Sequence, residues 1–167
     1  MKNLFYAFLS LLLLSCSGKN IDKKSSITLF NDCIFNLTNG EILSEPNIAA
    51  QKLYENYFNN SEIQIPLFKH IKHVGYDIFV GIPVRTSVDD ISKTVLEKHN
   101  RSLSNFISEK NSCYNQYLLN GSYIVEMAIR IDDKSLFYIA AITSNKILAD
   151  SLLSFNELSG RITKGRQ

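Results

Sequence analysis

Two histidines, His70 and His73, stand close enough in the sequence to share a ligand. If the segment were helical, residues three apart would lie on one face and both imidazoles would point at one ion. A zinc site needs three or four ligands, and Asp77 is the nearest further candidate, while Lys72 between the histidines would repel a cation. The alternative is two surface histidines on an irregular loop. We therefore expect no bound metal and no cofactor.

Nucleophiles and carboxylates form no recognisable catalytic set. No serine lies in a sequence pattern typical of hydrolases. Cys113 and His99 could form a thiol–imidazole pair, but the long helix expected around His99 makes a hydrogen-bonded histidine the simpler interpretation. Asp89-Asp90 fits the first turn of a helix, and Asp132-Asp133 fits a turn. We assign no catalytic residue.

The first sixteen residues are the most informative segment of the chain. Lys2 gives a positive start, residues 4–14 are almost entirely apolar, and Ser15 is a small residue directly before Cys16. This succession is typical of a secretory signal peptide. The apolar run is well short of the ~20 residues that a membrane-spanning helix needs.

Leu13-Leu14-Ser15-Cys16 resembles the lipobox of bacterial lipoproteins, although Leu14 stands where the family usually has a small residue. The resemblance implies cleavage before Cys16, acylation of Cys16 and anchoring in the lipid bilayer. Ser17 implies export to the outer membrane, with the protein facing the periplasm. The alternative is an ordinary signal peptide with a chance cysteine. Residues 16–26 are then the acylated cysteine and a polar tether.

Cys33 and Cys113 remain once Cys16 is acylated. An even pair of cysteines in an exported protein favours a disulfide, which would add roughly 4–5 kcal/mol in the chain-entropy model. The alternative is two buried thiols in separate strands, because a sequence does not give the distance between them.

The composition is that of a folded domain without a strong charge. Apolar residues make up 45% and aromatic residues 11% of the chain. The formal charge of +2 falls to +1 when the segment containing Lys2 is removed. A nearly neutral domain gives no electrostatic reason to bind nucleic acid.

The pattern of apolar residues predicts both strands and helices. We expect a strand at 33–38 with a hairpin turn at Asn39-Gly40, and a helix at 47–58. A strand at 76–83 precedes a helix that begins in the capping box Ser87–Asp90 and continues to Ile107. In the last third we expect a three-stranded meander with strands at 113–119, 122–131 and 136–143 and a turn at Asn120-Gly121. A final helix ended by Gly160 and a frayed basic tail should follow the meander.

The order of elements from Tyr76 to Ile162 resembles the PsbP, Mog1 and DcrB-like proteins. The resemblance rests on that order, on residues 79–83 before the Ser87–Asp90 capping box, and on Asn120-Gly121 before Tyr123. It implies an α+β fold in which helices pack on an antiparallel sheet. The chain then divides into a signal peptide at 1–15, a tether at 16–26, one domain at 27–162 and a basic tail at 163–167. Members of this family mostly bind other proteins.

These observations favour binding over catalysis. Tyr114, Tyr117 and Tyr123 cluster around the second hairpin, either as an interface for a protein partner or as residues lining the helix-covered face of the sheet. The leading hypothesis is a lipid-anchored protein-binding module, in its specific form an immunity-type protein against a periplasmic toxin. One alternative is an accessory lipoprotein of envelope assembly. Another is an enzyme acting on envelope glycans or lipids.

Overall fold

The computed structural model describes residues 26–58, 63–99 and 105–165. A seven-stranded antiparallel sheet forms the centre, in the order β3-β4-β5-β9-β8-β7-β6. Its strands, in that order, are β3 Ile42–Ser44, β4 Leu67–His73, β5 Tyr76–Gly81, β9 Ser135–Thr143, β8 Ser122–Asp132, β7 Ser112–Leu119 and β6 Asn105–Glu109. The predicted α+β class with an antiparallel sheet is therefore confirmed.

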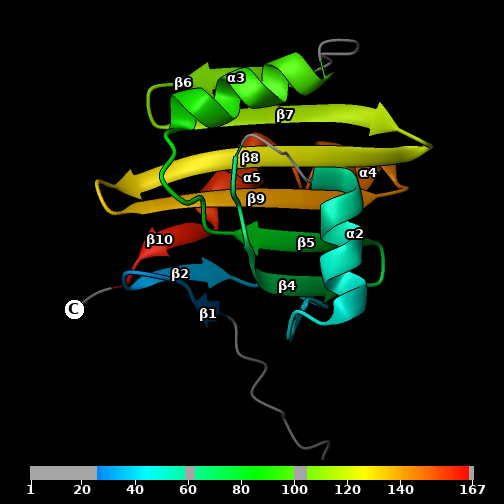
Figure 1. Cartoon of the computed structure of the whole chain (residues 1–167). Helices are drawn as coiled ribbons and strands as arrows, with labels where there is room; N and C mark the ends of the chain where they lie inside the picture. The colour runs from blue at the N-terminus through cyan, green and yellow to red at the C-terminus, as the bar shows by residue number, and fades with distance from the viewer. Residues whose placement is uncertain (1–25, 59–62, 100–104, 166–167) are drawn as a thin grey trace, which may run out of the picture.

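Helices and a second, smaller sheet cover the two faces of this sheet (Figure 1). The helices α2 (Ile48–Phe58) and α3 (Val88–His99) lie on one face. The helices α4 (Lys146–Asp150) and α5 (Phe155–Gly160) lie on the other, beside the three-stranded sheet β1-β2-β10. The strands of that sheet are β1 Ser26–Thr28, β2 Cys33–Asn36 and β10 Ile162–Lys164. The large sheet thus has an α2/α3 face and an α4/α5 face, each with its own apolar core.

The position of β9, covered on both faces, explains why its sequence is almost entirely apolar. Successive side chains of a strand point to opposite faces, and both faces of β9 are covered. Phe137 and Ile139 pack in the core of the α4/α5 face. Tyr138 and Ala140 pack in the core of the α2/α3 face. The strand β9 lies in the middle of the sheet, between β5 and β8.

The hairpin between β7 and β8 follows the sequence prediction closely. Asn120 and Gly121 have φ values of 52° and 80°, and positive φ at both central residues is the requirement of a type I′ turn. The register continues from Leu119↔Ser122 to Ser112↔Ile129. The strands at 76–81, 112–119 and 122–132 and the helix at 48–58 all match the expected segments.

Asn39-Gly40 does not form the predicted hairpin. The strand β2 pairs with β1 and β10, whereas β3 pairs with β4 in the other sheet. Of the two turn residues only Gly40 has a positive φ, 86°, so the type I′ conformation is not reached. The turn instead carries the chain from one sheet to the other and delivers Glu41 into the interior.

The long helix predicted from Ser87 to Ile107 is shorter in the structure. Its capping box is confirmed, since the Asp90 amide donates to Ser87 Oγ (3.1 Å) and Asp90 Oδ2 accepts from the Ser87 amide (2.9 Å). The helix ends at His99, and Phe106 and Ile107 belong to β6, where they pair with Asn115 and Tyr114. Apolar residues at helical spacing thus belong in part to a strand.

The C-terminal segment also departs from the prediction. The expected single helix is divided into α4 and α5, and Ser151 Oγ donates to the Ile147 carbonyl (2.6 Å) at the end of α4. The break lets Leu153 and Leu158 both enter the core. Residues 163 and 164 of the predicted basic tail are not frayed, because together with Ile162 they form β10, which pairs with β2 over Cys33–Phe35.

A buried ion pair ties β10 to the rest of the fold. Arg161 donates to a Glu41 carboxylate oxygen, and the exposed fractions of the two side chains are 7% and 0%. Glu41 also accepts from the Tyr76 hydroxyl (2.7 Å) and the Thr38 amide (2.8 Å). The Arg161 guanidinium lies over the Phe35 ring at 4.4 Å. This network joins the two sheets at the residue that precedes β10.

Candidate functional site

The two histidines do not converge on a metal. Both lie on β4 and not on an irregular loop, and residues three apart on a strand face opposite sides. His70 is buried, stacks on Phe79 with 4.8 Å between ring centres, and has Nε2 2.8 Å from Asp77 Oδ1. His73 stacks on Tyr76 at 4.3 Å on the other face. Among the described residues no group of three or more His, Cys, Asp or Glu side chains is placed to hold an ion.

Two of the three tyrosines proposed for an interface lie in the core. Tyr114 is on the α4/α5 face, where its hydroxyl donates to Gln116 Oε1 (2.8 Å). Tyr117 is on the α2/α3 face and hydrogen-bonds Glu126. Both are buried, so neither offers surface to a partner, and the alternative of residues lining covered sheet faces is correct for them. Only Tyr123 of the three is partly exposed.

The two cysteines are separate, buried thiols in the structure. Cys33 belongs to the core of the α4/α5 face and Cys113 to that of the α2/α3 face, so the large sheet lies between them. The predicted disulfide is absent from this structure for that reason. Burial raises the pKa of the Cys113 thiol to about 11, which leaves it protonated and unreactive at neutral pH. Cys16, the predicted lipidation site, lies outside the described residues.

A buried carboxylate with tyrosines around it occupies the α2/α3 face. Glu126 accepts a hydrogen bond from the Tyr138 hydroxyl, and it raises the pKa of Tyr54 in addition to the larger effect of burial. Asn115 pairs with Glu126 across the sheet and is fully buried. Glu126 is buried because the helices α2 and α3 cover this face of β8.

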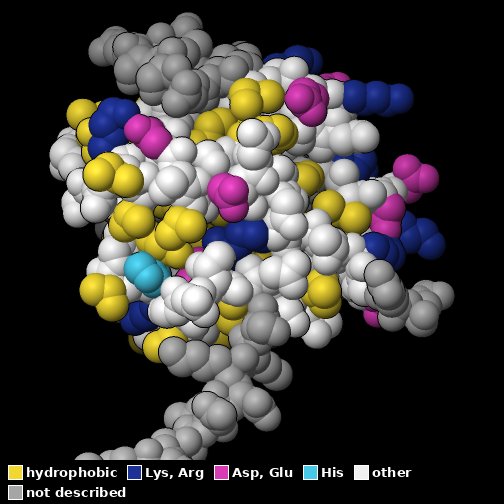
Figure 2. All heavy atoms as spheres, turned by 180° about the vertical axis from the view of Figure 1, so that it is seen from behind, with side chains coloured by type: hydrophobic (Ala, Val, Ile, Leu, Met, Phe, Trp, Pro, Cys, Tyr) yellow, Lys and Arg dark blue, Asp and Glu magenta, His cyan; other side chains and the backbone are white. Residues whose placement is uncertain are grey.

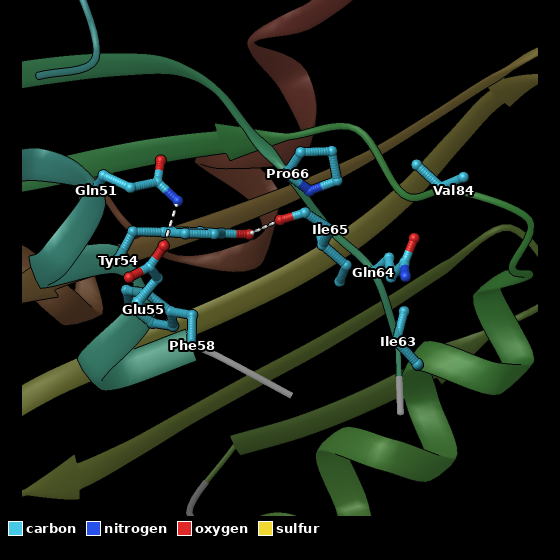
Figure 3. A pocket seen from close by; sticks show the side chains of 9 residues that line it. All are labelled: Gln51, Tyr54, Glu55, Phe58, Ile63, Gln64, Ile65, Pro66 and Val84. Carbon is cyan, nitrogen blue, oxygen red and sulfur yellow. Dashed lines mark hydrogen bonds between the residues drawn. The ribbon is translucent and has the colours of Figure 1, made fainter. Parts of the chain in front are cut away.

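A pocket of about 360 Å³ opens beside this buried cluster, between α2 and the segment that leads into β4 (Figure 3). Its apolar wall is formed by Tyr54, Phe58, Ile63, Ile65, Pro66 and Val84. Its polar rim is formed by Gln51, Glu55 and Gln64. The volume is at the low end for ligand pockets and suits one large side chain or a small molecule.

Hydrogen bonds hold the two sides of the pocket in position. The Tyr54 hydroxyl donates to the Ile65 carbonyl (2.9 Å), which joins α2 to the opposite wall (Figure 3). Gly81 lies behind this bond, since a Cβ there would meet the Tyr54 hydroxyl oxygen at 2.9 Å and Ile65 Cγ2 at 2.6 Å. The Val84 amide donates to the Gln64 carbonyl (2.9 Å), so that two lining residues are joined to each other. The pocket is therefore built by packing and hydrogen bonds and does not depend on a ligand.

The side chains that line the pocket are suited to binding. Glu55 is the charged side chain among the lining residues, and it accepts a hydrogen bond from Gln51 Nε2 (2.8 Å). An apolar wall with one carboxylate at its rim fits a group that is apolar along its length and neutral or positive at its end. Sequence reasoning missed the pocket, because its two walls come from segments that each resemble ordinary core or loop residues.

Comparisons with known proteins support the fold. No family model matches the chain, and no curated protein matches it in sequence. Its structure is similar to the solution structure of cyanobacterial PsbP (CyanoP) from Synechocystis sp. PCC 6803, with a TM-score of 0.51 and 13% identity. The match covers 89% of this chain and 96% of that one. The fold resemblance expected from Tyr76 onward is thus confirmed and extends over most of the chain.

Among the residues described, no helix combines the length and apolar character needed to cross a membrane.

Proposed function

We propose that this chain is an exported, lipid-anchored protein that binds another protein without catalysis, and that the pocket beside α2 is its recognition site. The pocket is the observation that supports recognition by this domain. The signal sequence and Cys16 supply the anchor, in the outer membrane with the domain facing the periplasm. A protein so placed meets partners in the periplasm and at the membrane surface.

The pocket favours a protein partner that inserts one side chain. Burying an aliphatic or aromatic group against Tyr54 and Phe58 contributes about 1.5–3 kcal/mol, and such anchors in pockets dominate many protein interfaces. Glu55 at the rim would pair with a lysine or arginine whose aliphatic stem lies on the apolar wall. The pocket therefore fits a basic or amphipathic side chain presented by a partner segment.

An immunity-type protein is the specific form of this proposal. A small, anchored domain that covers a toxin delivered to the periplasm needs a binding surface and no catalytic group. In that case the partner is a toxin encoded beside the gene, and cells without the gene lose fitness next to sister cells or rivals that carry the toxin.

Capture from the native envelope tests the binding function. The lipid-anchored chain is compared with the Glu55→Lys variant, which reverses the rim charge of the pocket, and with Glu45→Lys, an equal change on exposed surface outside the pocket. Mass spectrometry should find one stoichiometric protein with the wild type and with Glu45→Lys, and at least about ten-fold less with Glu55→Lys, since 1.4 kcal/mol corresponds to ten-fold.

Equal recovery with all three baits would show that the pocket is not the recognition site. An empty capture with the wild-type bait would contradict the binding function and favour a small-molecule or glycan ligand.

A further inference from the structure

Four aliphatic side chains are exposed at one end of the large sheet. Val74 is fully exposed in the turn between β4 and β5, and Ile147 is 76% exposed in the first turn of α4. Leu118 and Leu119, at the tip of the β7–β8 hairpin, are 55% and 36% exposed. Hydrophobic side chains gather along the corresponding side of the molecule, on the left of Figure 2. Three separate segments thus present apolar groups in one direction.

Strand pairings and hydrogen bonds place these segments beside one another. Leu118 pairs with Tyr123 across the hairpin, and Tyr123 pairs with Thr143 on the next strand. Thr143 Oγ1 donates to the Gly75 carbonyl (2.7 Å) in the β4–β5 turn. The helix α4 follows Thr143 closely, and Asn145 caps it through the amides of Ile147 (2.9 Å) and Leu148 (3.4 Å). We call Val74, Leu118, Leu119, Tyr123 and Ile147 the hairpin-end surface.

The charges around the hairpin-end surface suit an apolar or anionic environment. Asp150 is paired with Lys146 at 2.5 Å and also accepts from Gln116 Nε2 at 2.8 Å, so its negative charge is compensated locally. Lys72 is exposed near the β4–β5 turn. An exposed lysine next to aliphatic groups can extend toward phosphate groups while its stem stays in an apolar layer.

The shape of this surface favours a lipid bilayer over a folded partner. The aliphatic groups stand on two turns and a helix start, and Val74 has no neighbour that shields it. A protein interface would need a shape-complementary core, whereas an acyl layer accepts separate protruding groups. Tyr123, with an apolar ring and a polar hydroxyl, is a residue type enriched at the membrane interface.

The predicted tether is long enough to bring this surface to the membrane. The described structure begins at Ser26, and the predicted acylated residue is Cys16. The ten intervening peptide units span up to about 35 Å when extended, which is comparable to the size of the domain. The anchor therefore holds the domain at the membrane without fixing which side of the domain faces it.

We propose that the hairpin-end surface lies on the bilayer, with Val74, Leu118 and Ile147 inserted at the boundary between headgroups and acyl chains. This orientation is a property of the domain itself, and it rests on the proposed lipid anchor only for bringing the domain to the membrane. It fixes the direction in which the pocket beside α2 faces and leaves that pocket free for a partner.

A single tryptophan measures this orientation, because the natural chain has none. Ile147→Trp places the probe in the hairpin-end surface. Asp133→Trp is the control, since Asp133 is an exposed residue in the turn at the other end of β8, about 35 Å away along the eleven residues of that strand. Each chain starts at residue 17 with an N-terminal hexahistidine tag in place of Cys16, and is held on phosphatidylethanolamine–phosphatidylglycerol vesicles by nickel-chelating lipid.

Brominated acyl chains in these vesicles should quench the emission of the Ile147→Trp protein, and its maximum should shift to the blue. The Asp133→Trp protein should show neither change. Adding Val74→Asp and Leu118→Asp to Ile147→Trp should remove the quenching while far-ultraviolet circular dichroism stays unchanged.

Equal quenching at both positions, or none at position 147, would overturn the proposal. If position 147 became protected only when a protein partner was added, the surface would be a protein interface instead. Because these vesicles contain no partner protein, the outcome is independent of whether the pocket beside α2 binds one.

Discussion

Replacing Glu41 by alanine is expected to lower the free energy of unfolding by about 3–5 kcal/mol, as for other buried ion pairs that lose one partner. Glu41 is fully buried and accepts hydrogen bonds from Arg161, Tyr76 and the Thr38 amide. Without it, the Arg161 guanidinium keeps the Asn36 carbonyl as an acceptor at 2.9 Å and remains in the interior without a counter-charge. Urea unfolding followed by circular dichroism measures the change.

The double variant Glu41→Leu, Arg161→Met is the matched control. It removes both charges together, so most of the lost stability should return. Lys164→Met is a second control, because the Lys164–Asp132 pair is exposed and should contribute little to stability. If Glu41→Ala lost no more stability than Lys164→Met, this would contradict the role given to the Glu41 network in joining the two sheets.

Alkaline unfolding is the second large effect that we expect. Burial, together with Glu41, raises the pKa of Tyr76 to about 12. Burial and the nearby Glu126 carboxylate also raise the pKa values of Tyr54, Tyr117 and Tyr138 above the ordinary value near 10. Between pH ~10 and 12 the unfolded chain releases tyrosine protons that the folded protein keeps. The stability that these protonated tyrosines contribute is thus complete below pH ~10 and is lost as the pH rises.

The slope of the free energy of unfolding against pH follows from the linkage between proton binding and folding. Each tyrosine that stays protonated in the folded protein but ionises in the unfolded chain lowers the free energy of unfolding by about 1.4 kcal/mol per pH unit. Urea unfolding at several pH values between 9 and 12 should therefore show a steep decline. The Tyr138→Phe variant, although less stable at neutral pH, should decline less steeply. A free energy of unfolding that stays constant through this range would contradict the burial of these hydroxyls.

The central part of the fold was predictable from sequence because local signals and packing agree there. Asn120-Gly121 specifies a type I′ turn, and the apolar run of β9 matches a strand covered on both faces. The resemblance in element order from Tyr76 onward pointed to the same architecture. Where a segment has one strong turn or cap signal and one consistent periodicity, its sequence is sufficient to predict its secondary structure.

The predictions failed where long-range pairing decides between alternatives. Phe106 and Ile107 fit a helical stripe, yet pairing with β7 makes them strand residues. The C-terminal tail has no strong strand signal, and β10 forms because β2 offers a free edge and Arg161 finds Glu41. No local pattern contains those partners, so single-sequence reasoning had no access to them.

The candidate site was less predictable than the fold. The tyrosines were chosen as residue types common at interfaces, but the helices that bury Tyr114 and Tyr117 could not be placed over them from sequence. The pocket arises where α2 meets the segment before β4, and its main tie is a hydrogen bond from a helix tyrosine to a backbone carbonyl. Such a contact leaves no trace in residue spacing.

Site-specific photo-crosslinking in living cells tests the central claim of binding at the pocket most directly. A benzophenone amino acid replaces Gln64 at the rim of the pocket, or Asp133 in the distant β8–β9 turn as the control. We expect one discrete protein adduct from position 64 and none from position 133. Identical adduct patterns at the two positions, or no adduct at position 64, would contradict it.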